Sequence, residues 1–216
     1  PNNVDIQEFM VMPVGFDTFS EGLRCGVEIF HHLKRVLSEK RLNTAVGDEG
    51  GFAPAGLTTR NALDYVARAI EASGYVLGDQ IGIALDPAAS EFFHRPDQIY
   101  RLQRDGINLS SDEMVDMYES LVENYPIVSI EDALAEDDWN GWVELTKRIG
   151  AEVQIVGDDI FATQEQHVQR GIQTRAANAV LVKVNQVGTV TETLATMAMA
   201  KKTGWGTIVS HRSGET

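Results

Sequence analysis

The sequence predicts an α/β protein whose strands belong to a barrel of alternating strands and helices. Short apolar runs rich in β-branched residues recur along the chain, and each one stops at a polar or ionisable side chain. Nearly continuous apolar runs are typical of strands that are covered on both faces, as in parallel sheets. The runs cover residues 81–86, 127–132, 153–159, 179–186 and 207–213.

The spacing of the run ends points to a barrel of repeated strand–helix units. The last three separations between the ionisable residues that end the runs are 27, 25 and 28 residues. Each is about one strand–helix unit of a barrel that has eight such units in roughly 250 residues. The longer gap after the first run contains residues 92–108, whose alternating pattern predicts a small hairpin. The ionisable residues are Asp86, Glu131, Asp158, Lys183 and His211.

Helices are expected between the runs. Residues 110–113 (SSDE) have the pattern of a capping box, which would open a helix that runs to about residue 124. Residues 58–73 and 191–203 are each followed by a glycine, the residue preferred after a helix C-terminus. An earlier helix is predicted from one apolar stripe with spacings of three and four residues. The stripe comprises Leu23, Val27, Phe30, Leu33 and Leu37.

The number of strands indicates an incomplete barrel. Residues 6–14 (IQEFMVMPV) add one strand to the five runs, which makes six, whereas a closed barrel of this type needs eight. We therefore expect residues 1–216 to be part of one barrel domain, with strands missing at both ends.

Composition excludes several classes of function. The chain carries 18 Lys and Arg against 32 Asp and Glu, a net charge of −14, which disfavours attraction to nucleic acids or anionic lipids. A single cysteine, Cys25, excludes an internal disulfide and fits a reducing cytosol. No apolar run approaches the roughly 20 residues that a membrane span needs. A cytoplasmic protein is expected, although the sequence leaves open an additional surface or secreted pool.

Three carboxylates at run ends predict a metal site. Residues at the carboxyl ends of barrel strands point into one mouth, so Asp86, Glu131 and Asp158 are expected to converge. Closely spaced carboxylates repel one another, and a divalent cation relieves that repulsion. Because all three offer hard oxygen ligands, Mg²⁺ is favoured over Zn²⁺. The alternative is that each acid caps the helix that follows it.

Lys183 lies inside an apolar run, where an ammonium group is costly unless it is paired or loses its proton. A salt bridge to a barrel carboxylate and a catalytic base are both compatible with this position, and the neighbouring acids favour the base. His211, Arg212 and Ser213, after the last run, offer a cation and a hydroxyl suited to a phosphate or carboxylate.

Two further acidic segments precede these runs. Residues 43–54 (NTAVGDEGGFAP) place Asp48 and Glu49 among glycines, and lack the pattern of a Walker loop. Glycines around an acid are by themselves typical of a tight turn. Gln7 and Glu8 are adjacent, so they cannot both face one side of a regular strand, and one must gain access at an irregular strand end.

The chain resembles the enolase family over essentially its whole length. The matching motifs occur in family order and at family-like spacing, although Pro87 stands where that family is expected to have Cys. They are NNVDIQEFM, NTAVGDEGGFAP, DPAASEF, YPIVSIED, QIVGDD, LVKVNQ and SHRSGET.

The resemblance implies a Mg²⁺-dependent lyase that interconverts 2-phosphoglycerate and phosphoenolpyruvate in glycolysis, with two Mg²⁺ ions per site. It implies a barrel with an antiparallel second strand, here residues 6–14. Lys183 would remove the C2 proton, and Glu49, with Glu8 beside it, would assist departure of the hydroxyl. The implied metal ligands are Asp86, Glu131 and Asp158, and the implied substrate contacts are Gln7, Glu8, Lys183, His211, Arg212 and Ser213.

The same resemblance implies parts that these residues do not contain: the amino-terminal α+β domain, the strand with a glycine-rich His motif, and the final strand with a second lysine. The isolated piece is therefore expected to be inactive, and the full-length protein to be a homodimer or higher homo-oligomer. Two alternatives are kept: another enolase-superfamily acid dehydratase, and a non-catalytic barrel.

Overall fold

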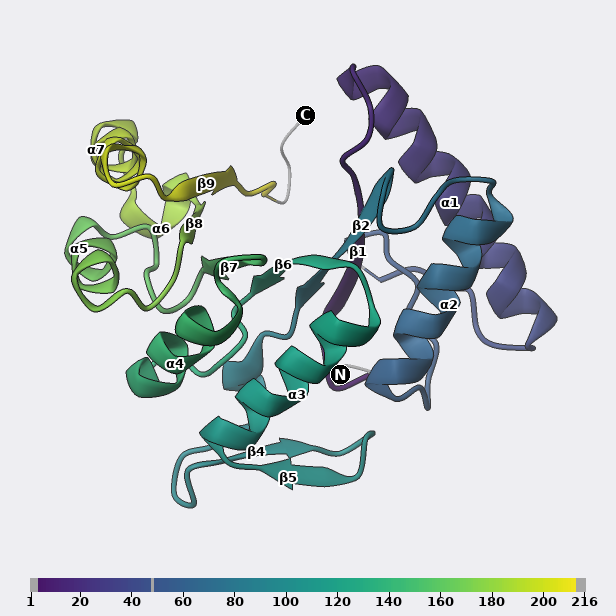
Figure 1. The fold of residues 1–216 in the computed structure, drawn as a ribbon, viewed down its shortest axis with the longest axis horizontal. Coiled ribbons are helices and arrows are strands. Elements are labelled where there is room, and N and C mark those ends of the chain that lie inside the picture. Colours follow the sequence, from purple (N-terminus) through teal and green to yellow (C-terminus); the bar gives the residue numbers. More distant parts are fainter. Residues whose placement is uncertain (1–3, 48, 213–216) are drawn as a thin grey trace. The chain divides into compact units, whose positions relative to one another are not determined.

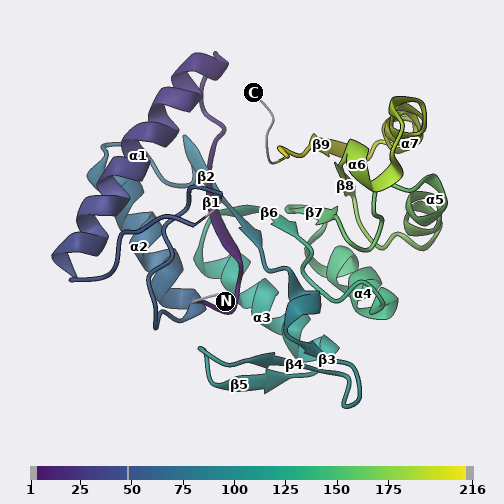
Figure 2. The same cartoon turned by 180° about the vertical axis from the view of Figure 1, so that it is seen from behind.

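A computed structural model describes residues 4–47 and 49–212 of the chain. These residues form two compact units. The first comprises segments Pro1–Pro87, Arg101–Asn108 and Ser120–Val128, and the second comprises Ala88–Tyr100, Leu109–Glu119 and Ser129–Thr216. The course of the chain through its helices and strands can be followed from both sides in Figures 1 and 2.

The strands confirm the predicted α/β class and the incomplete barrel. In the main sheet the strand order is β1-β2-β6-β7-β8-β9. β1 is antiparallel to β2, as the family resemblance implied, whereas β6 to β9 are parallel. The bounds are β1 (Glu8–Pro13), β2 (Ile81–Asp86), β6 (Ile127–Glu131), β7 (Gln154–Gly157), β8 (Ala179–Val182) and β9 (Gly206–Val209).

Helices follow most of these strands. The predicted capping box is present, because the backbone N–H of Ser110 donates to the Glu113 carboxylate at 2.8 Å and the backbone N–H of Glu113 donates to the Ser110 hydroxyl at 3.4 Å. The helices are α1 (Phe19–Glu39), α2 (Thr59–Ala72), α3 (Ser111–Asn124), α4 (Trp139–Ile149), α5 (Glu165–Thr174), the short α6 (Val184–Val187), α7 (Val190–Lys202) and a 3₁₀ turn, Ala89–Glu91. None of the helices in the described ranges is long and apolar enough to cross a bilayer.

In the first unit, α1 packs against α2 and β1. The predicted apolar stripe of α1 is wrong at its amino-terminal end, because Leu23 and Val27 are 57% and 49% exposed. The buried face is formed by Cys25 and Ile29, together with Leu37 of the predicted stripe. Leu23 precedes Cys25 by two residues, which is about 200° of helical rotation and places it on the opposite side.

In the second unit, an aromatic cluster fixes the helices against the strands. Phe161 and Trp142 are fully buried, and the Phe161 ring lies 5.5 Å from that of Trp205 and 6.2 Å from that of Trp139. Such ring pairs add about 0.5–1.5 kcal/mol beyond the burial of their surface. Since Phe161 lies three residues after Asp158, this packing anchors the loop that carries a predicted site residue.

The predicted runs 153–159 and 207–213 extend beyond β7 and β9, which end at Gly157 and Val209, and two other predicted elements differ more. Residues 92–108 form three short strands rather than one hairpin: β3 (Phe93–His94), β4 (Ile99–Leu102) and β5 (Ile107–Leu109). The chain reverses twice there, at Gln98 with φ of 53° and at Gly106 with φ of 71°.

The other difference concerns residues 179–186, which were expected to be one strand. β8 ends at Val182, and α6 begins at Val184. The backbone N–H of Lys183 donates to the Thr163 hydroxyl at 2.8 Å, and the N–H of Gln186 donates to the Lys183 carbonyl at 3.1 Å. The chain therefore turns into a helix directly after the strand.

Candidate active site

The register of the parallel strands places one predicted ligand on the apolar inner face of the sheet. Glu131 at the end of β6 pairs with Val156 of β7, and Val156 pairs with Ala179 of β8. Paired residues of adjacent strands point to the same face. Val156 and Ala179 belong to one buried apolar cluster, with Leu181 as its third member. Glu131 therefore belongs to the face that carries this cluster.

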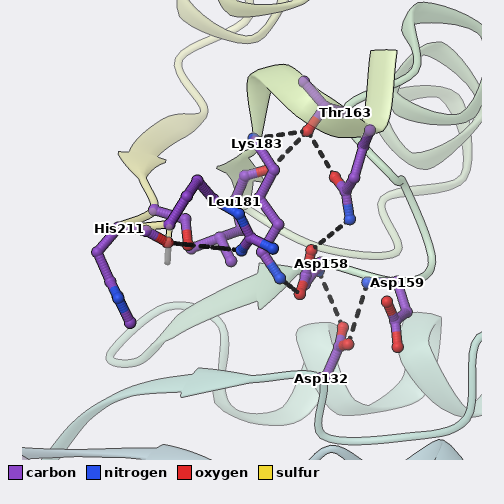
Figure 3. A network of polar contacts seen from close by, with 10 residues as sticks. Asp132, Asp158, Asp159, Thr163, Leu181, Lys183 and His211 are labelled. Carbon is purple, nitrogen blue, oxygen red and sulfur yellow. Dashed lines mark hydrogen bonds and ion pairs between the residues drawn. The ribbon is translucent and has the colours of Figure 1, made fainter. Parts of the chain in front are cut away.

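Asp158 and Lys183 extend the same face beyond the strand ends. Asp158 lies two residues after Val156, and Lys183 lies two residues after Leu181, so both continue the alternation of that face. Their side chains form an ion pair between Nζ and Oδ2, and are only 16% and 9% exposed. Figure 3 shows the side chain of Lys183, the residue after β8, reaching to Asp158. The structure thus contains the salt bridge that was one of the two interpretations of Lys183.

The second oxygen of Asp158 is also held. The side-chain amide of Gln186 donates to Oδ1 of Asp158 at 3.0 Å, and the Thr163 hydroxyl donates to the amide oxygen of Gln186 at 2.8 Å. A buried ion pair is tolerable only when its remaining hydrogen-bonding capacity is satisfied. Gln186 supplies that bond here, so both oxygens of Asp158 have partners.

Asp132 binds the backbone of the loop that carries Asp158. Its two carboxylate oxygens accept the N–H groups of Asp158 at 2.9 Å and Asp159 at 3.0 Å. Burial raises the pKa of the Asp132 carboxyl well above its ordinary value, although the two N–H groups favour the charged form. Burial, and then the charge of Asp158, also raise the pKa of Asp159.

One group of acids in the described ranges could share an ion. Asp132, Asp158 and Asp159 each offer a carboxylate oxygen, and these oxygens lie within 4.8 Å of one another. This group shares only Asp158 with the predicted ligand set. Carboxylates are hard oxygen donors that suit Mg²⁺, so the donor chemistry of Asp158 and its neighbours fits that ion.

The other predicted ligand, Asp86, lies in the first unit. It is the last residue of β2, it is 9% exposed, and it pairs with Glu8 of the antiparallel β1. Residues opposite each other in such a pair share a face, so Glu8 and Asp86 face the same side. Gln7 precedes the strand and is exposed. Convergence of Asp86 with Glu131 and Asp158 stays a prediction.

The glycine-rich segment forms a tight turn, as its glycines predict. The N–H of Gly47 donates to the Gly51 carbonyl at 2.8 Å, and the N–H of Gly50 donates to the Gly47 carbonyl at 3.0 Å. Glu49 is exposed within this turn, and Asp48 lies outside the described residues. A catalytic role for Glu49 stays a prediction.

The loop after β9 carries the remaining candidates. The Ser210 hydroxyl donates to the His211 carbonyl at 2.9 Å, and one Arg212 nitrogen lies 3.5 Å from both the Ser210 hydroxyl and that carbonyl. Ser213 lies outside the described residues. Substrate binding by His211, Arg212 and Ser213 stays a prediction.

Sequence reasoning missed three residues that hydrogen-bond to Asp158 or Lys183: Asp132, Thr163 and Gln186. The acidic pair Glu131–Asp132 could have indicated the first, because alternation sends neighbouring side chains to opposite faces. Gln186 was placed in a strand, which hid its proximity to Asp158. For Thr163 no local pattern gives a signal.

Comparison with known proteins agrees with the fold. A family model described as the enolase C-terminal TIM barrel domain matches residues 1–216. The chain is 54% identical over 212 residues to "Enolase 1" of Methanospirillum hungatei, covering 98% of the chain and 49% of that protein. It is 52% identical over 215 residues to "Enolase" of Natranaerobius thermophilus, covering 100% of the chain and 50% of that protein. The chain thus spans about half the length of the curated relatives it matches.

Proposed function

This chain belongs to the enolase family, and from that premise we propose that the full-length protein interconverts 2-phosphoglycerate with phosphoenolpyruvate and water. The observation that carries the proposal is the buried Asp158–Lys183 pair, formed at the ends of two neighbouring parallel strands on the sheet's inner face. A lysine beside a carboxylate that can hold a cation offers the two parts of this chemistry: a base, once the amine has lost its proton, and an anchor for the cation that would stabilise the charge on the substrate carboxylate.

Lys183 is the proposed base. Its Nζ would accept the proton from C2 of 2-phosphoglycerate, which requires the amine to have released its own proton beforehand. The short apolar strand before it and the turn into α6 after it fix the direction of the side chain. Because the side chain is 16% exposed, little water competes for the amine nitrogen.

Asp158, Glu131 and Asp86 are the proposed Mg²⁺ ligands, with two ions per site. When bound, Mg²⁺ would stabilise the negative charge that develops on the substrate carboxylate as the proton leaves. The support from this chain is that all three are carboxylates at strand ends and that two of them belong to the same inner face of the sheet.

Glu49 is the proposed general acid, with Glu8 beside it. Hydroxide is a poor leaving group, so a positioned acid that protonates the C3 hydroxyl is needed. Gln7, His211, Arg212 and Ser213 are proposed to contact the substrate, and the Arg212 guanidinium suits a phosphate or carboxylate. These assignments rest on the motifs shared with the enolase family.

The setting of the full-length protein is also proposed. We expect a cytoplasmic homodimer or higher homo-oligomer that acts in glycolysis on a small phosphorylated acid. The net charge of −14 supports a site that works without nucleic acid. The isolated chain of 216 residues is expected to be inactive.

The test is an assay of the full-length protein for the rise in ultraviolet absorbance as phosphoenolpyruvate forms. The expected result is turnover that EDTA abolishes and added Mg²⁺ restores. Lys183→Ala should remove the exchange of the C2 hydrogen with solvent, whereas Lys147→Ala, which changes an exposed lysine paired with Glu144, should leave it intact. Exchange retained in Lys183→Ala rejects Lys183 as the base.

Two other results would redirect the assignment. Turnover of a sugar acid without a phosphate ester, in place of 2-phosphoglycerate, would support another enolase-superfamily acid dehydratase. Titration calorimetry showing no Mg²⁺ binding to the full-length protein would support a non-catalytic barrel.

A further inference from the structure

A chain of directed hydrogen bonds connects the backbone of Lys183 to the carboxylate of Asp158. The Lys183 N–H donates to the Thr163 hydroxyl oxygen at 2.8 Å. That hydroxyl lies 2.8 Å from the amide oxygen of Gln186, and the amide nitrogen of Gln186 lies 3.0 Å from Oδ1 of Asp158. Figure 3 shows these bonds as one continuous path.

The direction of each bond follows from elementary chemistry. A backbone N–H can only donate, so the Thr163 oxygen accepts from Lys183 and keeps a single proton to give. Its nearest acceptor is Gln186 Oε1 at 2.8 Å, since the Leu181 carbonyl is 3.4 Å away. The oxygen of the Gln186 amide therefore faces Thr163, and its NH₂ group faces Asp158. Because the Asp158 carboxylate can only accept, it too requires the NH₂ group, so the threonine and the carboxylate together hold the amide in this orientation.

Thr163 is itself held in an unusual conformation. Its φ of 55° lies in the left-handed region, where a β-branched residue is rare and strained. It is fully buried, and its carbonyl accepts the Thr196 hydroxyl of α7 at 2.9 Å. Strain of this kind persists only where surrounding contacts determine the conformation, and here those contacts place the hydroxyl between Lys183 and Gln186.

We propose that Thr163 and Gln186 are positioning residues that hold the Asp158 carboxylate in one orientation for metal binding. With Oδ1 tied to Gln186, the carboxylate presents Oδ2 in one direction, toward Lys183. Without the hydroxyl, the amide oxygen of Gln186 loses its donor, so the side chain is no longer anchored at that end and holds Oδ1 of Asp158 less firmly. The inference rests on the proposed function, because it assigns Asp158 as a ligand.

The test measures Mn²⁺ binding to the full-length protein by electron paramagnetic resonance without substrate. Thr163→Val preserves the shape of the side chain but removes the hydroxyl, and Gln186→Met removes the amide from a half-buried position. Each should weaken Mn²⁺ binding about tenfold, as loss of a residue behind a metal ligand typically does. Thr163→Ser, which restores the hydroxyl, should bind Mn²⁺ nearly as the wild type does.

The matched control is Thr193→Val. Thr193 is a buried threonine of α7 whose hydroxyl donates at 2.8 Å to the carbonyl of Thr189, the N-cap residue of that helix. Its variant loses a similar hydrogen bond, so the midpoints of thermal unfolding of Thr193→Val and Thr163→Val should fall comparably. The Mn²⁺ affinity should be unchanged in Thr193→Val.

The outcomes separate this inference from the proposed function. Folded Thr163→Val and Gln186→Met proteins with wild-type Mn²⁺ affinity overturn the inference alone. Equal loss of affinity in Thr163→Ser and Thr163→Val also overturns it, because the hydroxyl would then be irrelevant. A wild type that binds Mn²⁺ but does not convert 2-phosphoglycerate rejects the proposed function, while the affinities still test the positioning. A wild type that binds no Mn²⁺ overturns both.

Discussion

Replacing Asp132 tests how the loop that carries Asp158 is held. In Asp132→Ala, the backbone N–H groups of Asp158 and Asp159 lose the carboxylate oxygens they bind at 2.9 and 3.0 Å. Asp158 is 6% exposed, so its N–H would be left without a partner, whereas Asp159 is exposed and its N–H can be rehydrated. The substitution therefore leaves one buried donor, the backbone N–H of Asp158, without a partner.

The magnitude follows from that count. A buried donor without a partner costs about 1–3 kcal/mol, and a rehydrated one costs much less. In the native protein, burial of the Asp132 carboxylate is unfavourable, as its raised pKa indicates. Removing the carboxylate also removes this penalty. The unpaired Asp158 donor costs about 2 kcal/mol and relief of the burial penalty offsets part of that, so the local stability of this loop should fall by at most about 2 kcal/mol. Asp132→Asn keeps one acceptor oxygen, so it should lose about half as much.

The assay is hydrogen exchange of the Asp158 and Asp159 amides in the native full-length protein. A loss of about 2 kcal/mol corresponds to roughly 30-fold faster exchange, so faster exchange up to about that size is expected. Asp137→Ala, which removes an exposed aspartate paired with Arg95, should leave these amides unchanged. Unaltered protection in Asp132→Ala would refute the reasoning, because it would mean that the burial penalty of the carboxylate cancels its bonds.

Two further predictions concern packing and pH. In Gly157→Ala the new Cβ would lie 2.3 Å from the Phe161 ring, so the variant should lose about 1–3 kcal/mol in urea denaturation. Gly51→Ala, with nothing within 4 Å of the added carbon, should lose far less. The N–H and hydroxyl of Ser110 lower the pKa of Glu113 below its model-peptide value of 4.5. The charged Glu113 carboxylate thus stabilises the folded protein above pH 4.5, and this stabilisation is lost as the pH falls through the lowered pKa. The difference in melting temperature between wild type and Glu113→Gln should therefore shrink with acidification.

Local sequence predicted the strands well where burial is uniform. Residues 81–86 were predicted with both ends correct, because every residue of that strand is buried and the apolar run has no competing pattern. The prediction for residues 179–186 was wrong beyond Val182. There the chain leaves the sheet because Lys183 donates its N–H to Thr163, a residue 20 positions away, and no local pattern contains that bond.

For helix α1, the sequence predicted the element but not which of its faces is buried. Its helical character follows from the spacing of apolar residues, but which face is buried depends on the surface it packs against. Several apolar faces were available in the sequence, and contact with α2 and β1 selects the one with Cys25 and Ile29.

The candidate site divides in a similar way. Strand ends and charge predicted Asp158 and Lys183, and the structure brings these two into contact. Lys183 can form the salt bridge and also act as the base, because the two belong to different states. The ion pair is present in the chain without substrate, whereas the proposed catalytic role begins once the amine is neutral. Asp132, Thr163 and Gln186, which hydrogen-bond to the backbone or the carboxylate of the site, gave no comparable sequence signal, because their partners lie far away in the sequence.

The adjacent acids Glu131 and Asp132 show how one strand end can serve two purposes. Pairing with Val156 assigns Glu131 to the inner face, so alternation sends Asp132 away from it. A φ of 42° then turns the chain at Asp132, and its carboxylate meets the amides that follow β7. Glu131 thus belongs to the inner face, where its proposed role is to bind Mg²⁺, while its neighbour Asp132 fixes the loop that carries Asp158. Exchanging the two residue types would therefore damage the site more than the unchanged net charge suggests.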